Sequence, residues 1–517
     1  MKLSYDYVII GAGSAGCVLA ARLSEDPDVR VALIEAGGVD SAAEIGLPVA
    51  FPTLFKSKFD WDFATEPEPA LGGRRVYLPR GKMLGGSSSM NAMIYIRGNP
   101  ADFDGWAEDG ALGWSYRDLL PYFIKAEGNE RGEAQLHGRL GPLTVSDGRS
   151  MHPLADRFVQ AGIEAGYPRN DDFNGPSQLG VGRYQVTQRD GARCSAARAY
   201  LHPARERPNL HVFTDALVIR LMLDGMRATG AAILHEGAEQ VLWAERETIL
   251  SAGAYGSPQI LMLSGIGRPA ALAPFGIATV MDLPVGENLQ DHAAALLNYL
   301  TDEPTLFTAG TPENLALYQA EQRGPLSSNI AEGGGFMTTR PGSDVPDIQL
   351  HMAPVLLADE GLAPPTVHAF DFGPCVLKPT SRGKVSLRSA RPDAKPRIVH
   401  NFLTTREDRE TMIEGVRICL DIANQPSLAA IRRGAYQAPE SDSEADIWSF
   451  LERYTQTLYH PTSTCSIGAV VDSELKVLGI DGLRVVDASI MPTIVRGNTN
   501  APTIAIAEKA ADLIRGT

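Results

Sequence analysis

The sequence predicts a mixed α/β fold, α+β overall, in which a domain with a parallel sheet contains an inserted domain with a mostly antiparallel sheet. A strand, a glycine turn, a helix and a second strand follow one another between residues 7 and 34. Strand-like runs return at residues 210–250, and alternating apolar residues of a different character fill residues 293–440. The chain has 517 residues, more than one ordinary core accommodates, so two or more domains are expected.

The first unit has the order strand, helix, strand. Residues 7–10 are an apolar run that ends at glycine, residues 14–24 place apolar side chains at helical spacing, and residues 29–34 form a second buried strand. The turn between the first strand and the helix reads Gly11-Ala12-Gly13-Ser14-Ala15-Gly16. This order of elements around a glycine turn is typical of a domain that binds a dinucleotide.

Each glycine of the turn has a physical role. Gly11 allows the tight turn, Gly13 lets the backbone approach a pyrophosphate, and Gly16 lets the helix pack on the strand. The N-terminus of the helix attracts the anion. Glu35 follows the second strand, where a carboxylate accepts the ribose hydroxyls and disfavours a 2′-phosphate. We therefore predict a Rossmann-type domain that binds FAD or NAD rather than NADP.

The same turn permits a second interpretation. Ser14 stands between a strand and a helix, as the nucleophile of an α/β hydrolase does. Such an enzyme needs several strands before that serine to build its sheet and oxyanion loop, and only one strand fits here. A hydrolase is therefore the weaker hypothesis, and a purified protein without colour would favour it.

A glycine- and serine-rich loop follows at residues 80–91, inside a stretch, residues 60–150, with few periodic runs. The amides of Gly85, Gly86 and Ser87 could cradle a phosphate and approach a flat ring, and Asn91 could donate a hydrogen bond. Taken alone, a loop of this composition more often only connects two elements.

Periodicity predicts the remaining elements. Helices are expected at residues 154–166, 257–263, 407–423 and 502–514, and strands at residues 212–213, 216–223, 231–235, 247–250, 348–352, 385–387 and 483–487. We predict a discontinuous nucleotide-binding domain of residues 1–154, 210–292 and 455–517. Residues 155–209 and 293–454 are expected to form the inserted substrate-binding domain.

Composition narrows the class of protein. A net charge of -15 argues against binding to nucleic acid. Five separated cysteines without a CxxC pair argue against a disulfide framework and a metal site, and favour a reducing compartment. No signal peptide and no apolar run of membrane-spanning length is apparent. We expect a cytoplasmic protein, with association to a membrane surface left open.

Several motifs together resemble those of the glucose-methanol-choline (GMC) oxidoreductases. They are Gly81–Asn91, Gly253–Gly267 and the C-terminal segments that hold His460 and Asn500. Asn288–His292 and Val485–Ser489 are similar to the choline dehydrogenase-like and alkanol dehydrogenase-like branch. The resemblance covers almost the whole chain, and three separate motifs in the right order are far more specific than the glycine turn alone.

The resemblance implies FAD as the cofactor. The residues expected to bind it are Gly11, Gly13, Ser14, Ala15, Gly16, Glu35, Ala36, Gly85, Gly86, Ser87, Asn91, Ala92, Val218, Ala252, Gly253, Asp487, Ala488, Asn500 and Thr503. Some family members tie the flavin covalently to a histidine in the Gly-Gly loop. Met90 stands at that place here, so we expect FAD to be bound without a covalent link.

The resemblance also implies the chemistry. Alcohol oxidation requires a base for the hydroxyl proton and a partner for the oxygen while a hydride leaves for flavin N5. His460 resembles the family's base, which must be unprotonated near neutral pH. Asn500 resembles the second active-site residue, whose amide would hydrogen-bond the substrate oxygen. The helix expected at residues 502–514 would direct its positive end toward the flavin.

Four other residues carry weaker expectations. His351 and Glu332 are candidates for the substrate pocket, although a hydrogen-bonded sheet histidine and a capping carboxylate are the alternatives. Cys465, five residues after His460, is expected to be a packed thiol. Ser463 replaces a glycine that the family commonly has, so its side chain could alter the backbone near the flavin.

The predicted function is FAD-dependent oxidation of an alcohol, preferably primary and uncharged, to an aldehyde. A quinone or another acceptor that is not oxygen would take the electrons. The alternatives are an alcohol oxidase that yields hydrogen peroxide and a non-redox flavoprotein, a lyase or a photodecarboxylase, on the same fold. The sequence leaves the identity of the alcohol and the oligomeric state open.

Overall fold

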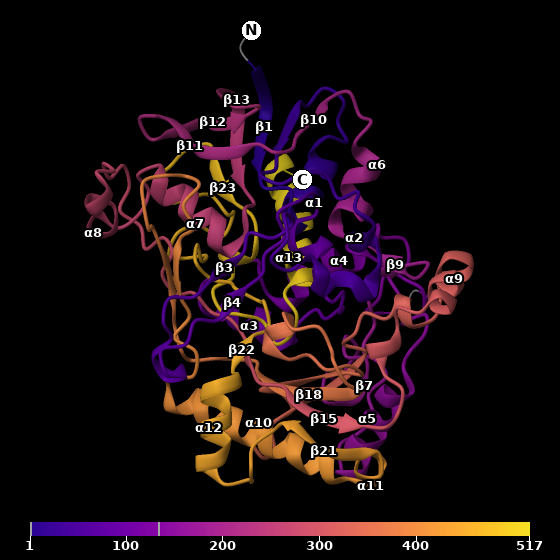
Figure 1. The fold of residues 1–517 in the computed structure, drawn as a ribbon. Coiled ribbons are helices and arrows are strands. Elements are labelled where there is room, and N and C mark those ends of the chain that lie inside the picture. The colour runs from indigo at the N-terminus through magenta and orange to yellow at the C-terminus, as the bar shows by residue number, and fades with distance from the viewer. Residues whose placement is uncertain (1–2, 133–134, 517) are drawn as a thin grey trace.

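The computed structural model describes residues 3–132 and 135–516. The N-terminal and C-terminal parts of the chain lie together in the upper half of Figure 1, whereas the orange part, about residues 300 to 450, builds most of the lower half. Within the described residues, two large sheets of seven and eight strands form the framework. The predicted mixed α/β class, with one partly parallel and one antiparallel sheet, is confirmed.

The first sheet combines strands from both ends of the chain. Its order is β10-β2-β1-β13-β12-β11, and β23 pairs with β13. The pairings among β10, β2, β1, β13 and β23 are parallel, and those of β11 and β12 are antiparallel. The strands are β1 (Leu3–Ile10), β2 (Val31–Ile34), β10 (Leu210–Phe213), β11 (Leu217–Asp224), β12 (Arg227–His235), β13 (Ala238–Leu250) and β23 (Leu483–Val485).

The register of these parallel strands gathers their carboxyl ends at one edge. Ile10 pairs with Ile34 on one side and with Leu250 on the other, and Leu250 pairs with Val485. Ligands of open α/β sheets bind beyond the carboxyl ends of the strands, because loops and helix N-termini meet there. The segments that follow these four residues are therefore neighbours in space although they lie far apart in the sequence.

The second sheet comes from the inserted part of the chain, and its pairings are antiparallel. Its strands are β7 (Gly180–Arg183), β14 (Ala293–Ala294), β15 (Leu297–Thr301), β16 (Gly333–Met337), β17 (Ile348–Ala353), β18 (Ala369–Val376), β21 (Arg432–Gln437) and β22 (Gln456–Thr457). This membership supports the proposed division into two domains. One strand departs from this division. Strand β22 pairs with β14, although residues 455–517 are predicted to belong to the nucleotide-binding domain.

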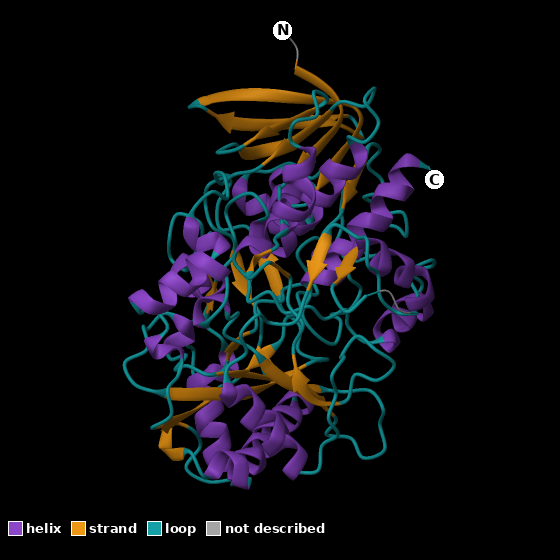
Figure 2. Cartoon of the chain, turned by 90° about the vertical axis from the view of Figure 1, so that its right-hand side faces the viewer, coloured by secondary structure: helices purple, strands orange, loops and turns teal. Residues whose placement is uncertain are grey.

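Figure 2 shows helices beneath the strands of the upper sheet and beneath those of the lower sheet. In the upper half, α1 (Ser14–Leu23) packs on β1 and β2, and α13 (Asn500–Arg515) packs against α1. In the lower half, α5 (Pro153–Glu164) and α10 (Arg406–Asn424) pack on the second sheet. These bounds agree within two residues with those predicted at 502–514, 154–166 and 407–423.

Helix α7 (Gly253–Leu263) begins four residues before the predicted start at Ser257. A proline is expected in the first turn of a helix, but Pro258 lies inside α7 and cannot donate to the carbonyl of Ala254. The hydroxyl of Thr464 donates to that carbonyl instead, at 2.7 Å. A side chain from a distant segment thus replaces the missing backbone hydrogen bond and lets the helix continue.

Two helices occur where few periodic runs were recognised. They are α3 (Pro100–Glu108) and α4 (Tyr116–Ala126). Each begins with a capping box, formed by Asn99 with Asp102 and by Ser115 with Asp118. The N-x-x-D and S-x-x-D spacings were the sequence signal for both helices.

The glycine turn packs helix α1 directly on the backbone of strand β1. A Cβ atom at Gly16 would lie 1.8 Å from the carbonyl oxygen of Gly11. Overpacking of this kind costs about 1–3 kcal/mol. We expect Gly16→Ala to lower the free energy of unfolding by at least that amount, measured by denaturant unfolding of the purified protein.

The matched control for this substitution is Gly105→Ala, also within a helix, where a Cβ atom would meet no atom within 4 Å. There, higher helix propensity should raise stability by up to about 1 kcal/mol. A Gly16→Ala protein as stable as Gly105→Ala would contradict the packing role of Gly16.

Candidate active site

A cavity of about 480 Å³ opens where the carboxyl ends of the first sheet face the second sheet. The predicted cofactor residues that line it are Gly11, Gly13, Ser14, Ala15, Glu35, Ala36, Gly86, Ser87, Asn91, Ala92, Val218, Ala252, Gly253, Asp487, Ala488, Asn500 and Thr503. Gly16 and Gly85 do not line it, because Gly16 packs against the backbone of Gly11 and Gly85 packs against the side chains of Ser89 and Ala197. Residues from both ends of the chain thus share one cavity.

Two helix N-termini open into this cavity. The N-cap residues of α1 and α13, Gly13 and Thr499, make no side-chain cap bond, and both line the cavity. The first amides of a helix have no partner within the helix, and the helix dipole adds partial positive charge there. Both ends therefore suit the anionic phosphates of a dinucleotide.

The Gly85 loop lies directly on the glycine turn. The amide of Gly85 donates to the carbonyl of Ala12 at 2.7 Å, and a Cβ atom at Gly86 would lie 2.8 Å from the Cα of Gly13. Gly85 and Gly86 also have positive φ values, 86° and 51°. Side chains larger than hydrogen do not fit at these contacts, so bare backbone forms this wall of the cavity.

Glu35 is a rigid acceptor at the cavity. Its carboxylate accepts hydrogen bonds from the amides of Ala12, at 3.0 Å, and Gly37, at 2.8 Å. Burial raises its pKa to about 7, although these hydrogen bonds oppose the shift. Two bonds leave lone pairs free for ribose hydroxyls, so the residues present fit the predicted dinucleotide.

Asp487 joins the C-terminal strand to helix α7. Its carboxylate accepts hydrogen bonds from the amide of Gly253, the hydroxyl of Ser257 and the amide of Ser489. The last of these caps a short 3₁₀ helix, η9 (Ala488–Ile490). This carboxylate therefore fixes two walls of the cavity relative to each other.

His460 lies in the cavity wall and is buried, with 8% of its surface exposed. Its Nδ1 atom lies 3.0 Å from Nδ1 of His292, whose Nε2 atom lies 3.1 Å from the carbonyl oxygen of Leu377. A carbonyl only accepts, so His292 carries its hydrogen on Nε2 and, being neutral, presents a lone pair at Nδ1. His460 must then donate from Nδ1, which leaves its Nε2 atom unprotonated.

Burial and the neighbouring His292 and His351 hold the pKa of His460 well below its usual range. Burial likewise lowers the pKa of His292 to about 4, so both rings are neutral at physiological pH. The Nε2 atom of His460 is therefore unprotonated at the cavity.

The backbone of His460 is held as firmly as its ring. Its amide donates to Asp291 at 2.8 Å, and the hydroxyl of Thr457 donates to the other oxygen of that carboxylate at 2.5 Å. Arg80 donates to the carbonyl of Tyr459 at 2.6 Å. These contacts hold the amide of His460 and the carbonyl just before it, and so fix the position of the imidazole.

The amide beside the base is Asn498, and here the structure differs from the prediction of Asn500. Nδ2 of Asn498 lies 3.2 Å from Nε2 of His460, and its Oδ1 accepts from Gln349 at 3.2 Å. Asn500 accepts a hydrogen bond from the hydroxyl of Ser14 at 2.8 Å and so joins α13 to α1. The sequence Asn498-Thr499-Asn500 contains two asparagines that could hydrogen-bond the substrate oxygen. The contact with His460 favours Asn498 for this position.

The two candidates for the substrate pocket have different positions. His351 lines the cavity, burial lowers its pKa to about 3, and its Nε2 atom has no hydrogen-bond partner in the described part of the chain. Glu332 does not line the cavity. It accepts from the hydroxyl of Ser328 and the amide of His152, so the prediction of a pocket role is corrected to that of a buried capping carboxylate.

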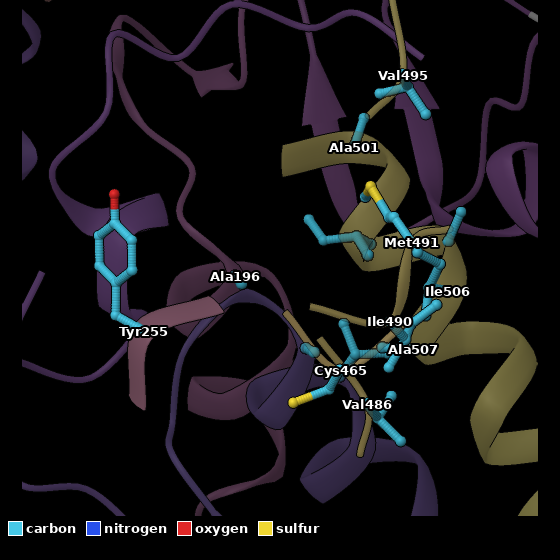
Figure 3. Packing of buried hydrophobic residues seen from close by; sticks show 14 of the residues in the cluster. Ala196, Tyr255, Cys465, Val486, Ile490, Met491, Val495, Ala501, Ile506 and Ala507 are labelled. Atoms are coloured by element: carbon cyan, nitrogen blue, oxygen red, sulfur yellow. The ribbon is translucent and has the colours of Figure 1, made fainter. Parts of the chain in front are cut away.

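Two residues near the base pack into the interior. Ser463 keeps the left-handed conformation that favours glycine, with φ 74°, and its hydroxyl pairs with that of Thr462 at 2.9 Å, away from the cavity lining. Figure 3 shows Cys465 beside Val486, Ile490 and Ala507 in the apolar core. Burial raises the pKa of this thiol, as expected of a packed cysteine.

Comparison with known proteins gives consistent results. Two family models described as GMC oxidoreductase match residues 5–294 and residues 379–507. The chain is 44% identical to the alcohol dehydrogenase [acceptor] of Pseudomonas putida, over 99% of this chain and 95% of that protein. It is 43% identical to the mitochondrial choline dehydrogenase of Mus musculus, over 100% and 90%.

The fold is also shared with a solved structure. The crystal structure of pyridoxine 4-oxidase from Mesorbium loti superposes with a TM-score of 0.91 and 34% identity, over 99% of both chains. The cavity, with its bare glycine walls and two helix N-termini, has the features that a flavin dinucleotide requires. The chain belongs to the GMC oxidoreductases, a family of FAD-binding flavoproteins.

Proposed function

We propose that this protein oxidises an uncharged primary alcohol to the aldehyde and passes the electrons to an acceptor other than oxygen. The observation that supports this proposal is the neutral imidazole of His460, whose Nε2 atom is held unprotonated at the cavity by the contact with His292. Such a base suits removal of a hydroxyl proton near neutral pH, and general bases typically contribute a factor of about 100 to 10,000 in rate.

Asn498 is the proposed partner of the substrate oxygen. One hydrogen of its Nδ2 group faces His460, and the second, for which no acceptor occurs among the described residues, can donate to the oxygen that loses its proton. Gln349 holds the amide in this orientation. A donor placed in advance beside developing negative charge stabilises the transition state without reorganising. Bound FAD supplies the acceptor for the hydride that leaves the alcohol carbon.

The predicted cofactor residues that line the cavity are proposed to hold FAD, with Gly16 and Gly85 supporting them from behind. Met90 lines the cavity at the place where some family members carry a linking histidine, so we propose that FAD is not covalently bound. No helix of the described residues is both long and apolar enough to cross a membrane. All five cysteines are free and buried, which supports the proposed cytoplasmic location.

An alcohol oxidase is the second candidate. The similarity to pyridoxine 4-oxidase favours it, whereas the similarity to the alcohol dehydrogenase [acceptor] of Pseudomonas putida favours the first candidate at higher identity. The base and its partners serve both reactions equally, because the two differ only in the final electron acceptor.

Anaerobic mixing with a panel of primary alcohols should bleach the visible flavin band of the wild-type protein. His460→Ala should slow this bleaching by a factor of about 100 to 10,000 while the FAD content stays unchanged, because the variant lacks the base. His235→Ala, a change on strand β12 away from the cavity, is the control and should bleach at the wild-type rate. A His460→Ala protein that bleaches normally would remove His460 from the mechanism.

Replacement of the two asparagines should have separable effects. Asn498→Ala removes the donor beside His460, and removal of one such donor costs a factor of about 100 to 1,000 in the bleaching rate. Asn500→Ala removes the contact with Ser14 and should lower FAD content more than it lowers the rate per bound flavin. If Asn500→Ala slows the rate per flavin more than Asn498→Ala does, the original assignment of Asn500 stands.

The proposed acceptor can be tested with the same protein. During turnover of a bleaching alcohol under air, hydrogen peroxide should form much more slowly than a quinone analogue or an artificial dye is reduced. Equal rates of peroxide formation and dye reduction would instead identify the protein as an oxidase.

A further inference from the structure

The substrate side of the cavity contains a buried carboxyl group that the proposed reaction does not use. Asp371 of β18 lines the cavity and is only 1% exposed. The amide of Leu357 donates to its Oδ2 atom at 3.2 Å, and among the residues that the structure describes no second hydrogen bond or ion pair reaches this carboxyl. A buried polar group without partners is costly, so a further partner is expected.

The sheet register places Asp371 along the cavity from the reactive end. In the pairing of β17 with β18, His351 lies opposite Gly373 and Ala353 lies opposite Asp371. Side chains two residues apart point to the same face of a sheet, at about 3.3–3.4 Å per residue, so Asp371 lies about 7 Å along the strands from the position of His351. The reactive end lies on the side of His351, because Gln349, two residues earlier on the same face of β17, donates to Asn498, which contacts His460.

The cavity wall beside Asp371 is apolar. Ala353, opposite Asp371 in the sheet, belongs to one apolar cluster with Phe51 and Leu357, and all three line the cavity. A substrate that spans this distance would bring an apolar chain past these side chains and its far end to Asp371. The far end needs a group that satisfies a carboxyl group in an environment of low polarity.

A hydroxyl group is the partner that this environment favours. Burial raises the pKa of Asp371 well above its usual range, which favours the protonated carboxyl, with one donor and one acceptor. A hydroxyl group complements both. An ammonium group would require an ionised carboxylate as its partner. Ionising Asp371 in an apolar wall is unfavourable, because burial disfavours the charged form.

We infer that the substrate is an alcohol with a second, distal hydroxyl group, which Asp371 binds while the first hydroxyl group meets His460. This inference rests on the proposed alcohol oxidation and narrows its substrate class to terminal diols and related hydroxylated alcohols. Asp371 is then a specificity residue, and it takes no part in the proton or hydride transfer.

The test compares a terminal hexanediol with hexanol in anaerobic flavin reduction. The ratio of kcat/KM for the diol to that for hexanol should fall about tenfold in Asp371→Leu, the size of a lost hydrogen bond of about 1.4 kcal/mol. Asp371→Asn should keep the ratio, because a carboxamide also has a donor and an acceptor. The diol has two ends that can react, whereas hexanol has one. This advantage is the same in every variant, so it cancels when the ratios of two variants are compared.

Glu332→Gln is the matched control, since Glu332 is a buried carboxyl of the same domain that the protein itself satisfies. It should leave the ratio unchanged.

A second measurement uses His460→Ala, in which turnover is blocked. Titration of its flavin spectrum should show hexanediol binding about tenfold more weakly once Asp371→Leu is added.

Three results would overturn the inference. An equal ratio in wild type and Asp371→Leu would mean that Asp371 serves only the sheet, where Asn298 lies opposite it. A wild-type preference for aminohexanol over hexanediol that is lost in Asp371→Asn would assign the site to a cation. If neither alcohol bleaches the wild-type flavin, the proposed function itself fails, whereas bleaching by hexanol without preference for the diol removes only this inference.

Discussion

The parallel pairing of β13 with β1 on one side and β23 on the other is the interaction on which the site depends. It brings the strand just before Asp487 to the same sheet edge as the first glycine turn. Helices α1 and α13 then open side by side at that edge, and the contact of Ser14 with Asn500 links them. Without this pairing, the cofactor residues and the base would belong to separate surfaces.

The second requirement is a defined protonation state of the proposed base, His460, and neutral groups set it. A backbone carbonyl that can only accept sets the hydrogen on His292, and His292 sets the hydrogen on His460. Burial keeps both rings uncharged. The hydrogen-bond partners of the ring, rather than the histidine alone, distinguish an imidazole with an unprotonated nitrogen at a cavity from an ordinary buried one.

Features that depend on local chemistry could be predicted from the sequence. The roles of Gly11 and Gly16, the position of Glu35 and the location of His460 at the cavity all follow from spacing and from motifs, and they agree with the structure. Features that depend on distant partners could not be predicted. The start of α7 needs the Thr464 hydroxyl, and the burial of Glu332 needs Ser328 and His152.

The sequence also could not distinguish Asn498 from Asn500, although the two are only two residues apart. Both asparagines follow one glycine and line one cavity, but only the fold shows which amide meets the imidazole. Asp371 was not recognised in the sequence because a lone carboxyl in an apolar strand has no motif. Its significance comes from the cavity that the strand faces.

The discontinuous first sheet also has a consequence for biosynthesis. Of the described elements, β23 and α13 leave the ribosome last, yet one forms an edge of the sheet around β13 and the other supplies a wall of the nucleotide site. Because domains fold as units as the chain emerges, the antiparallel domain can fold before the domain that surrounds it is complete. The nascent protein therefore becomes able to retain a flavin only after β23 and α13 have been synthesised.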